Sequence, residues 1–236
     1  MANTLAYTLH SIQDSFDHCD IGVAIPQFKT CDGAQLDSVN TVIVNAIQDI
    51  VDAFFRVASA SDDTHLGPPK NGLAVDPIIL TATPSLISVE LYIATWRSGT
   101  CRNHYTRTIN IDVEDSRELR LGEIFKNRTS AALFFSKYCE RALKVHWEVA
   151  PLAQWQVDIG RMSASQSLGF RNRDMVFIFA PHSVGPHAIG RTLVDIPFDA
   201  THQFLTDRMI DLLACNDHEP DEGRATPQLN LTPIES

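Results

Sequence analysis

Apolar residues recur along the chain with two different periods, and each period predicts a different kind of element. Over residues 37–58 they recur every three to four positions, which is typical of an amphipathic helix with one face on a core. Asp37 or Ser38 is suited to cap the N-terminus of this helix. Its apolar face comprises Val39, Ile43, Ala46, Ile47, Ile50, Phe54 and Val57, and Asn40, Asn45, Gln48, Asp49, Asp52 and Arg56 fall largely on the opposite face.

Other segments have the two-residue period or the continuous apolar run of β-strands. A strand over residues 19–28 is expected to end at Pro26, because proline cannot donate to a ladder. Residues 87–94 form the clearest half-buried strand. They are expected to pair antiparallel with residues 105–113, because only a short loop with a turn at Ser98 and Gly99 separates the two strands. Further strands are expected over residues 78–82, 175–180 and 192–196, and the apolar run 175–180 predicts burial on both faces.

The rest of the chain completes a single-domain pattern. Residues 130–145 predict a second amphipathic helix, residues 121–125 a short helical turn, and residues 199–214 a last helix that begins at Asp199. From residue 216 the chain becomes polar and acidic, which predicts a disordered tail.

Composition and charge exclude several classes of partner. The chain has 236 residues, 44% apolar and 20% charged, which suits one globular core. Nineteen basic against twenty-nine acidic residues give a formal charge of −10, and a field of that sign disfavours nucleic acid and anionic membranes. The sequence contains no uninterrupted apolar stretch long enough to predict a membrane span. The first residues do not form a signal peptide, so either the protein stays in the cytosol or an upstream signal was replaced by a start Met.

The five cysteines do not define a metal site, because their spacings match no ligand rhythm. Cys19 and Cys31 bracket a short segment, and one hypothesis is that they pair in an oxidising compartment. The favoured interpretation is five buried or unreactive thiols.

Most catalytic signatures are missing from the sequence: it contains no G-x-S-x-G elbow, S-x-x-K, H-E-x-x-H or C-x-x-C motif and no phosphate-binding glycine loop. One hypothesis combines His104, His182 and His187 as three zinc ligands with water in the fourth position. The favoured interpretation is that the histidines decorate a rigid turn, so that no metal is expected. The residues that fix this turn are Pro181, Gly185, Pro186 and Gly190.

Aromatic residues offer a second kind of candidate site. Tyr92, Trp96 and Tyr105 are expected to share the outer face of adjacent strands, where exposed rings make binding platforms. The alternative is that these rings close the rim of the core, as Trp and Tyr usually do.

Three stretches, taken in order, resemble a known family. The first is VAIPQF at residues 23–28, followed by a helix that opens at Val39 and Asn40. The second is LISVEL at 86–91, then Ser98, Gly99 and His104, then TINID at 108–112 and LRLGEIF at 119–125. The third is VFIFAPHSVGPHAIG at 176–190 with VDIPF at 194–198. This succession resembles the extracellular domain of RsiV-type anti-sigma factors, which also occurs as a non-catalytic module in PdaC-type peptidoglycan deacetylases and in a mycobacterial secreted antigen.

The resemblance implies an α+β fold, with a curved, mostly antiparallel β-sheet and two or three helices packed against it. It divides the chain into an N-terminal extension (1–18), a single domain (19–215) and a disordered acidic tail (216–236). Because the RsiV-type domain binds lysozyme, it also implies a binding role and a periplasmic or secreted location. His182 and His187 stand where the family usually has Tyr.

We therefore expect a bacterial cell-envelope domain that binds a protein or cell-wall-related ligand without catalysis, metal or cofactor. The expected partner is a lysozyme-like or other cell-wall hydrolase. The alternatives are a His-based metal-dependent hydrolase and an intracellular immunity or regulatory protein. Residues 98–105 and 181–190 are the expected ligand-facing loops, since loops on a rigid scaffold usually carry function. Their candidate contact residues are Trp96, His104, Tyr105, His182, Ser183 and His187.

Overall fold

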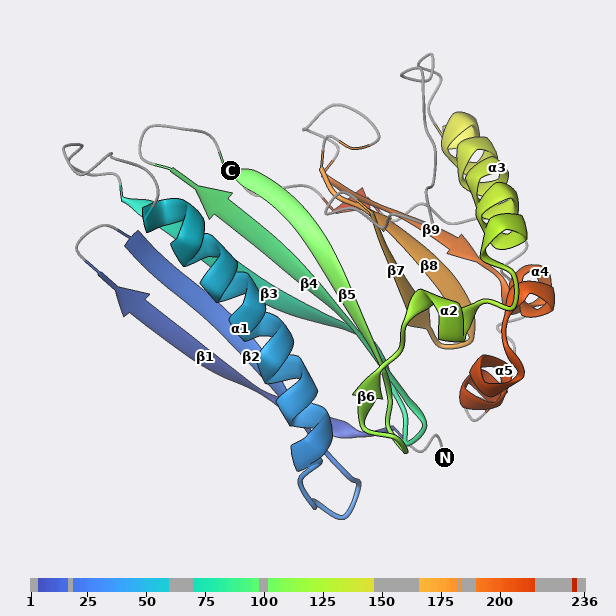
Figure 1. Ribbon diagram of the computed structural model, residues 1–236, viewed down its shortest axis with the longest axis horizontal. Coiled ribbons are helices and arrows are strands. Elements are labelled where there is room, and N and C mark those ends of the chain that lie inside the picture. Colours follow the sequence, from blue (N-terminus) through green and yellow to red (C-terminus); the bar gives the residue numbers. More distant parts are fainter. Residues whose placement is uncertain are drawn as a thin grey trace.

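The strands of this protein form two sheets. The computed structural model describes residues 4–16, 19–59, 70–97, 102–146, 166–181, 183, 190–214 and 231–232. The large sheet has the strand order β1-β2-β3-β4-β5-β6, and the small sheet has the order β10-β9-β8-β7. Figure 1 shows the two sheets next to each other, with α1 on the large sheet and α3 on the outer side of the small one. The α+β class expected from the resemblance is confirmed.

The bounds of the elements agree with the expected strands and helices at most positions. The large sheet comprises β1 (Ala6–Ser15), β2 (Cys19–Lys29), β3 (Asn71–Ala82), β4 (Leu86–Trp96), β5 (Asn103–Asp112) and β6 (Arg117–Glu118). The small sheet comprises β7 (Gln166–Arg171), β8 (Asp174–Phe179), β9 (Arg191–Ile196) and β10 (Leu231–Thr232). The helices are α1 (Asp37–Ser59), α2 (Leu121–Ile124), α3 (Arg128–His146), α4 (Phe198–Thr201), the 3-10 turn His202–Phe204 and α5 (Asp207–Ala214).

The N-terminal half contains a strand that the sequence pattern did not predict. β1 lies at the edge of the large sheet and pairs antiparallel with β2 along its whole length. β2 and β3 are parallel, and α1 makes the crossover between them. The expectation that Pro26 ends β2 is wrong. Pro26 lies inside the strand, opposite Leu9. β2 pairs with β3 only from Cys19 to Val23, so Pro26 occupies no position in that ladder.

Cys19 and Cys31 do not form a disulfide. Cys19 is the first residue of β2, and Cys31 follows the end of the same strand. At roughly 3.3 Å per residue of extended chain, the strand separates the two residues by more than about 30 Å. A disulfide needs Cα atoms within about 7 Å, so the pairing hypothesis is wrong for this fold.

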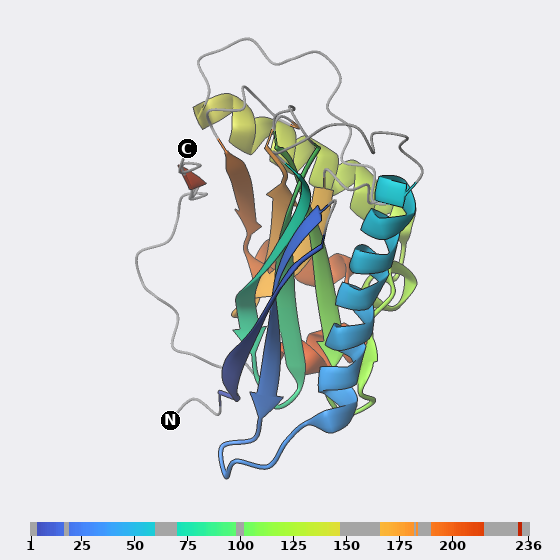
Figure 2. The same cartoon turned by 90° about the vertical axis from the view of Figure 1, so that its left-hand side faces the viewer.

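α1 packs on the large sheet through the face that its periodicity predicts. Ile43 and Ile47 are buried, and the same core contains Ile87, Val89 and other alternate residues of β4 and β5. Figure 2, which views the molecule from the β1 side, shows α1 lying along one face of this sheet. Asn40, expected on the wet face, is instead buried.

The Asn40 amide replaces a strand neighbour at the end of β2. Its Oδ1 accepts a hydrogen bond from the backbone N–H of Phe28 at 2.7 Å, and its Nδ2 donates to the Phe28 carbonyl at 3.1 Å. Both backbone groups of Phe28 are therefore satisfied by one side chain of α1. The polar residue is buried because it ties the helix to the strand.

The small sheet contacts the large one with its edge, through the outer strand β7. Side chains of the large sheet bind the backbone of β7, and we call this contact the polar seam. Thr108 Oγ1 donates to the Leu168 carbonyl at 2.7 Å, and Asn110 Nδ2 donates to the same oxygen at 2.8 Å. Ser88 Oγ accepts from the N–H of Phe170 at 3.0 Å and donates to Asn110 Oδ1 at 2.7 Å. These side chains do for β7 what a neighbouring strand would otherwise do.

The close approach at the seam requires a glycine. A Cβ at Gly169 would lie 2.4 Å from Leu80 Cδ1 and 3.0 Å from Ser88 Oγ. At the next residue pair, Thr81 Oγ1 donates to the Phe170 carbonyl at 2.8 Å. The missing side chain lets the backbone of β7 come within hydrogen-bond distance of the large sheet.

The outer face of the small sheet carries a second core under α3. Phe135 and Cys139 of α3 and Phe177 of β8 are fully buried there. β8 is buried on both faces, as its apolar run predicts. The last expected helix is broken, because α4 and the 3-10 turn end at Phe204 before α5 begins. In the part of the chain that the structure describes, no helix is both long and apolar enough to cross a bilayer.

Candidate functional site

The strands that carry the two expected ligand-facing loops have their loop ends on the same side of the molecule. β4 ends at Trp96 and β5 begins at Asn103, while β8 ends at Phe179 and β9 begins at Arg191. In Figure 1 these strand ends lie toward the upper edge. Of the residues expected there, His182, Gly185, Pro186 and His187 lie outside the described residues.

The aromatic rings do not all share one face. Directly opposite residues of neighbouring strands lie on the same face, and Tyr105 stands opposite Ile93 on the side that α1 covers. Tyr92 and Trp96 lie on the other face, which is turned toward the small sheet. The expectation that all three rings share an outer face is therefore wrong for Tyr105.

Tyr92 and Trp96 belong to a compact rim at the start of the β4–β5 connection. The Tyr92 ring stacks on the His104 ring with centroids 5.3 Å apart. The Arg102 guanidinium lies over the Trp96 ring, 4.8 Å from its centroid, which is the distance of a cation–π contact. Trp96 in turn stands opposite Gly72 in β3 and lies over it. These contacts hold the rim in place from two strands.

The described residues of the β8–β9 connection form a hydrogen-bonded turn. The N–H of Ser183 donates to the Ala180 carbonyl at 3.1 Å, and its Oγ donates to the same oxygen at 2.6 Å, with Pro181 between them. Gly190 has a φ of 75°, in the left-handed region that favours glycine. This connection therefore enters and leaves the sheet in defined conformations.

A buried ion pair that the sequence pattern did not reveal lies between the sheets. Glu90 in β4 has no exposed surface, and its Oε2 lies 3.4 Å from Nη1 of Arg191, which is itself largely buried. Neither carboxylate oxygen has a hydrogen-bond partner among the described residues. Burial raises the pKa of Glu90 to about 7, although Arg191 acts in the opposite direction.

The sequence pattern did not single out Glu90, because this residue stands in the polar register of β4. That register predicts a half-buried strand with Glu90 in water, but the small sheet covers this face, and β4 is buried on both sides over most of its length. In this conformation Glu90 is closed to a substrate, so we interpret it as a structural acid beneath the rim.

The zinc hypothesis rests mainly on residues that the structure does not describe. His104 is placed in the rim, but His182 and His187 are not among the described residues. Within those residues, no three His, Cys, Asp or Glu side chains gather as they would around a metal ion. The hypothesis therefore stays a prediction.

The protein is therefore an α+β fold in which the edge of a small sheet contacts a large sheet. Two solved structures share that fold. One is a DUF3298 family member from Bacteroides fragilis NCTC 9343, with a TM-score of 0.57, 14% identity, and 88% of this chain and 97% of the other covered. The second is a DUF3298 family protein from Pseudomonas aeruginosa PAO1, with a TM-score of 0.57, 11% identity and the same coverage.

At these identities the similarity shows the fold alone. No family model and no curated protein matches the sequence.

Proposed function

We propose that this protein is a non-catalytic binding domain for a protein or cell-wall-related ligand, which it contacts through residues 98–105 and 181–190. One observation carries the proposal. Both connections leave from strand ends at the same end of the molecule, one from each sheet. A ligand there meets a surface whose base is held by the Tyr92–His104 and Trp96–Arg102 contacts. A preorganised base of this kind lowers the entropic cost of binding.

The resemblance to RsiV-type domains supports a specific partner, a lysozyme-like cell-wall hydrolase. The formal charge of −10 favours a basic protein of that kind through long-range attraction. The same surface would serve an intracellular regulatory partner equally well, and a pull-down from the native host separates these two partners.

Calorimetric titration with hen egg-white lysozyme tests the proposal. We expect saturable binding at about 0.15 M salt, where weak long-range attraction is largely screened. Equine cytochrome c, another small basic protein, is the control for charge alone and should not bind. Equal binding of both proteins would contradict a specific site.

Loop variants then locate the contact. His104→Ala and Arg102→Ala should each weaken binding by about tenfold, as truncation of a central contact does. Gln48→Ala, on the exposed face of α1, is the matched control and should bind as the wild type does. Unchanged affinity in both loop variants, with folding intact by circular dichroism, would remove the rim from the binding surface.

A further inference from the structure

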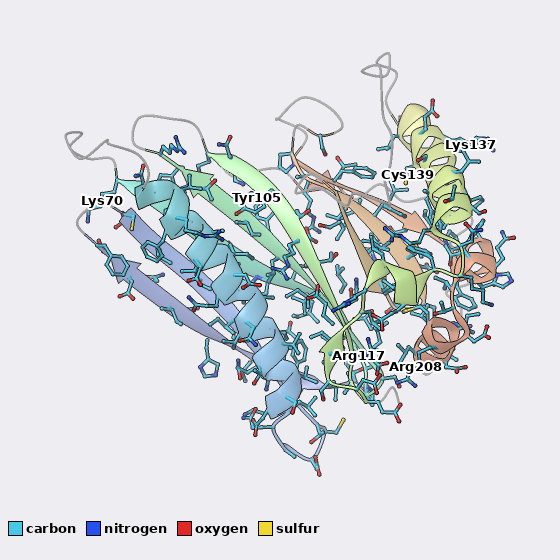
Figure 3. All side chains as sticks on the ribbon, in the orientation of Figure 1. Lys70, Tyr105, Arg117, Lys137, Cys139 and Arg208 are labelled. Atoms are coloured by element: carbon cyan, nitrogen blue, oxygen red, sulfur yellow. The ribbon has the colours of Figure 1, made fainter. Side chains whose placement is uncertain are left out.

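A long groove runs beside β5, from Tyr105 near the loop end to residues 117–124. It has a volume of about 1310 Å³ and lies between β5 on one side and residues 117–124 on the other, with β7 forming part of its wall. Figure 3 labels Tyr105 on β5 and Arg117 near β6, toward opposite ends of this region. We call it the β5 groove.

The β5 groove exposes a strand edge. β6 pairs with β5 only at Ile111 and Asp112, and the chain then turns away toward α2. The last backbone bond across this edge joins the N–H of Leu119 to the Asn110 carbonyl at 2.7 Å. From there to Asn103, no strand pairs with the outer edge of β5 among the described residues.

The geometry of antiparallel pairing fixes which groups point into the groove. The Asn110 carbonyl points outward, and backbone groups alternate in direction along a strand, so those of Thr108 and Thr106 point outward too. Ser167 Oγ already donates to the Thr106 carbonyl at 2.9 Å, so that carbonyl is satisfied. The outward N–H of Thr106 and the outward N–H and C=O of Thr108 are a template for another strand.

The lining of the β5 groove contains more arginines than carboxylates, although the protein as a whole is acidic. Its lining includes Arg107, Arg117, Arg120 and Arg128, against the two carboxylates Glu118 and Glu123. Arg107 lies within ion-pair distance of both Glu118 and Asp49, and Arg117 pairs with both Glu123 and Asp115. In the described parts of the chain, Arg120 and Arg128 have no carboxylate within ion-pair distance. Arg128 therefore remains for a bound anion, and so does Arg120, whose charge also helps to lower the pKa of Glu123.

Apolar side chains complete the lining. Ile50, Ile93, Leu119 and Leu121 face the same groove as the arginines. A peptide on this edge would meet both arginines and apolar side chains, because Arg107 stands opposite Leu91 on the α1 side, where Ile50 and Ile93 also lie. The groove is suited to a segment that carries both acidic and apolar residues.

We propose that the β5 groove binds an extended, acidic segment of a protein partner, which adds to β5 as a further strand. Backbone hydrogen bonds to the N–H of Thr106 and to the N–H and C=O of Thr108 hold the segment, and its carboxylates bind Arg120 and Arg128. The proposal goes beyond the loop site, since it uses other residues on another side of the large sheet. Lysozyme binding at the loops would be independent of it.

A defined peptide tests strand addition. The probe is acetyl-Glu-Val-Glu-Val-Glu-Val-Glu-amide, titrated into the full chain and followed by NMR. We expect saturable binding and slower amide hydrogen exchange at Thr106 and Thr108. The same peptide with all internal amides N-methylated keeps its charge but loses its donors, so its affinity should fall by about tenfold or more. Equal affinity of the two peptides, or binding without protection of these amides, would overturn strand addition.

Charge variants test the acidic preference. The double change Arg120→Glu and Arg128→Glu should reduce peptide affinity by about tenfold or more, because both anchoring cations are reversed. The matched control, Arg56→Glu with Lys137→Glu, changes net charge equally on the exposed faces of α1 and α3 and should bind almost normally. The Lys analogue of the peptide should not bind. Equal losses in both double variants, or binding of the Lys peptide, would contradict the proposed partner chemistry.

Discussion

The two faces of the large sheet are buried by different means. The face under α1 is apolar and follows β4 and β5 through Ile87, Val89, Ile109 and similar residues. The face toward the small sheet carries Ser88, Thr106 and Asn110, and it is equally well buried. The first face is stabilised by removing apolar surface from water, and the second by hydrogen bonds from side chains to the backbone of β7.

The comparison shows that a polar register in a strand does not always indicate contact with water. Hydroxyl and amide groups at alternate positions can satisfy a strand edge that would otherwise be exposed. A substitution should therefore affect the free energy of unfolding differently on the two faces. An apolar contact weakens gradually as atoms are removed, whereas a lost partner leaves a buried polar group unsatisfied.

The largest expected effect is at the centre of the polar seam. Ser88→Val removes the acceptor of the Phe170 N–H and the donor to Asn110 Oδ1 in one step. Two buried groups lose their partner, which should lower the free energy of unfolding by about 4 kcal/mol. Urea unfolding measures this loss. Ser88→Thr, which keeps the hydroxyl, is the control and should lose much less; equal losses would mean that packing matters more than the hydrogen bonds.

The apolar face should respond almost as strongly to a truncation. Ile47→Ala removes a buried side chain of α1 from the core on the large sheet, and we expect a loss of about 3 kcal/mol. Gln48→Ala, one position further and exposed, should change the free energy of unfolding by less than about 0.5 kcal/mol. Similar losses in the two variants would be incompatible with the facing of α1.

The ion pair between the sheets should make the polar face sensitive to pH. Since the pKa of Glu90 is raised to about 7, its protonated form is favoured in the folded state. The contribution of Glu90 to the free energy of unfolding is fully present below the ordinary carboxyl pKa near 4.5, and it is lost as the pH rises through 7. A change from 4.5 to about 7 corresponds to about 3 kcal/mol.

The Glu90→Gln variant isolates this contribution. Between pH 4 and pH 8, the wild type should lose up to about 3 kcal/mol more of its unfolding free energy than Glu90→Gln does. Glu140→Gln, an exposed position on α3, should follow the wild type. Parallel pH profiles of the wild type and Glu90→Gln would show that Glu90 is ionised in the folded protein without penalty.

The smallest effect is expected at the rim, where the polar face reaches the loops. A Cβ at Gly72 would lie 2.0 Å from Cζ2 of Trp96, so Gly72→Ala must displace the ring. We expect a loss of about 2 kcal/mol from this overpacking, together with a shift in tryptophan fluorescence. Gly22→Ala, whose Cβ would meet no atom within 4 Å, is the matched control. A fluorescence spectrum unchanged by Gly72→Ala would show that Trp96 does not lie over this glycine.

The candidate site was only partly predictable from the sequence. Turn residues and aromatic residues located the two loops and the rim with Trp96 and His104, because those signals are local. The Glu90–Arg191 pair and the β5 groove were not predicted. Each depends on residues far apart in the chain, and a polar residue in a strand pattern looks the same whether water or another sheet covers it.

The sequence by itself determined the elements whose patterns are local. The periodicity of residues 37–58 predicted α1, alternation predicted β4 and β5 as an antiparallel pair, and the apolar run predicted β8. Only the tertiary structure decided that β7 lies edge-on against β4 and β5, that β1 extends the large sheet and that Asn40 is buried. The physical reason is that these contacts are hydrogen bonds between groups distant in sequence, and no single segment carries a periodic trace of them.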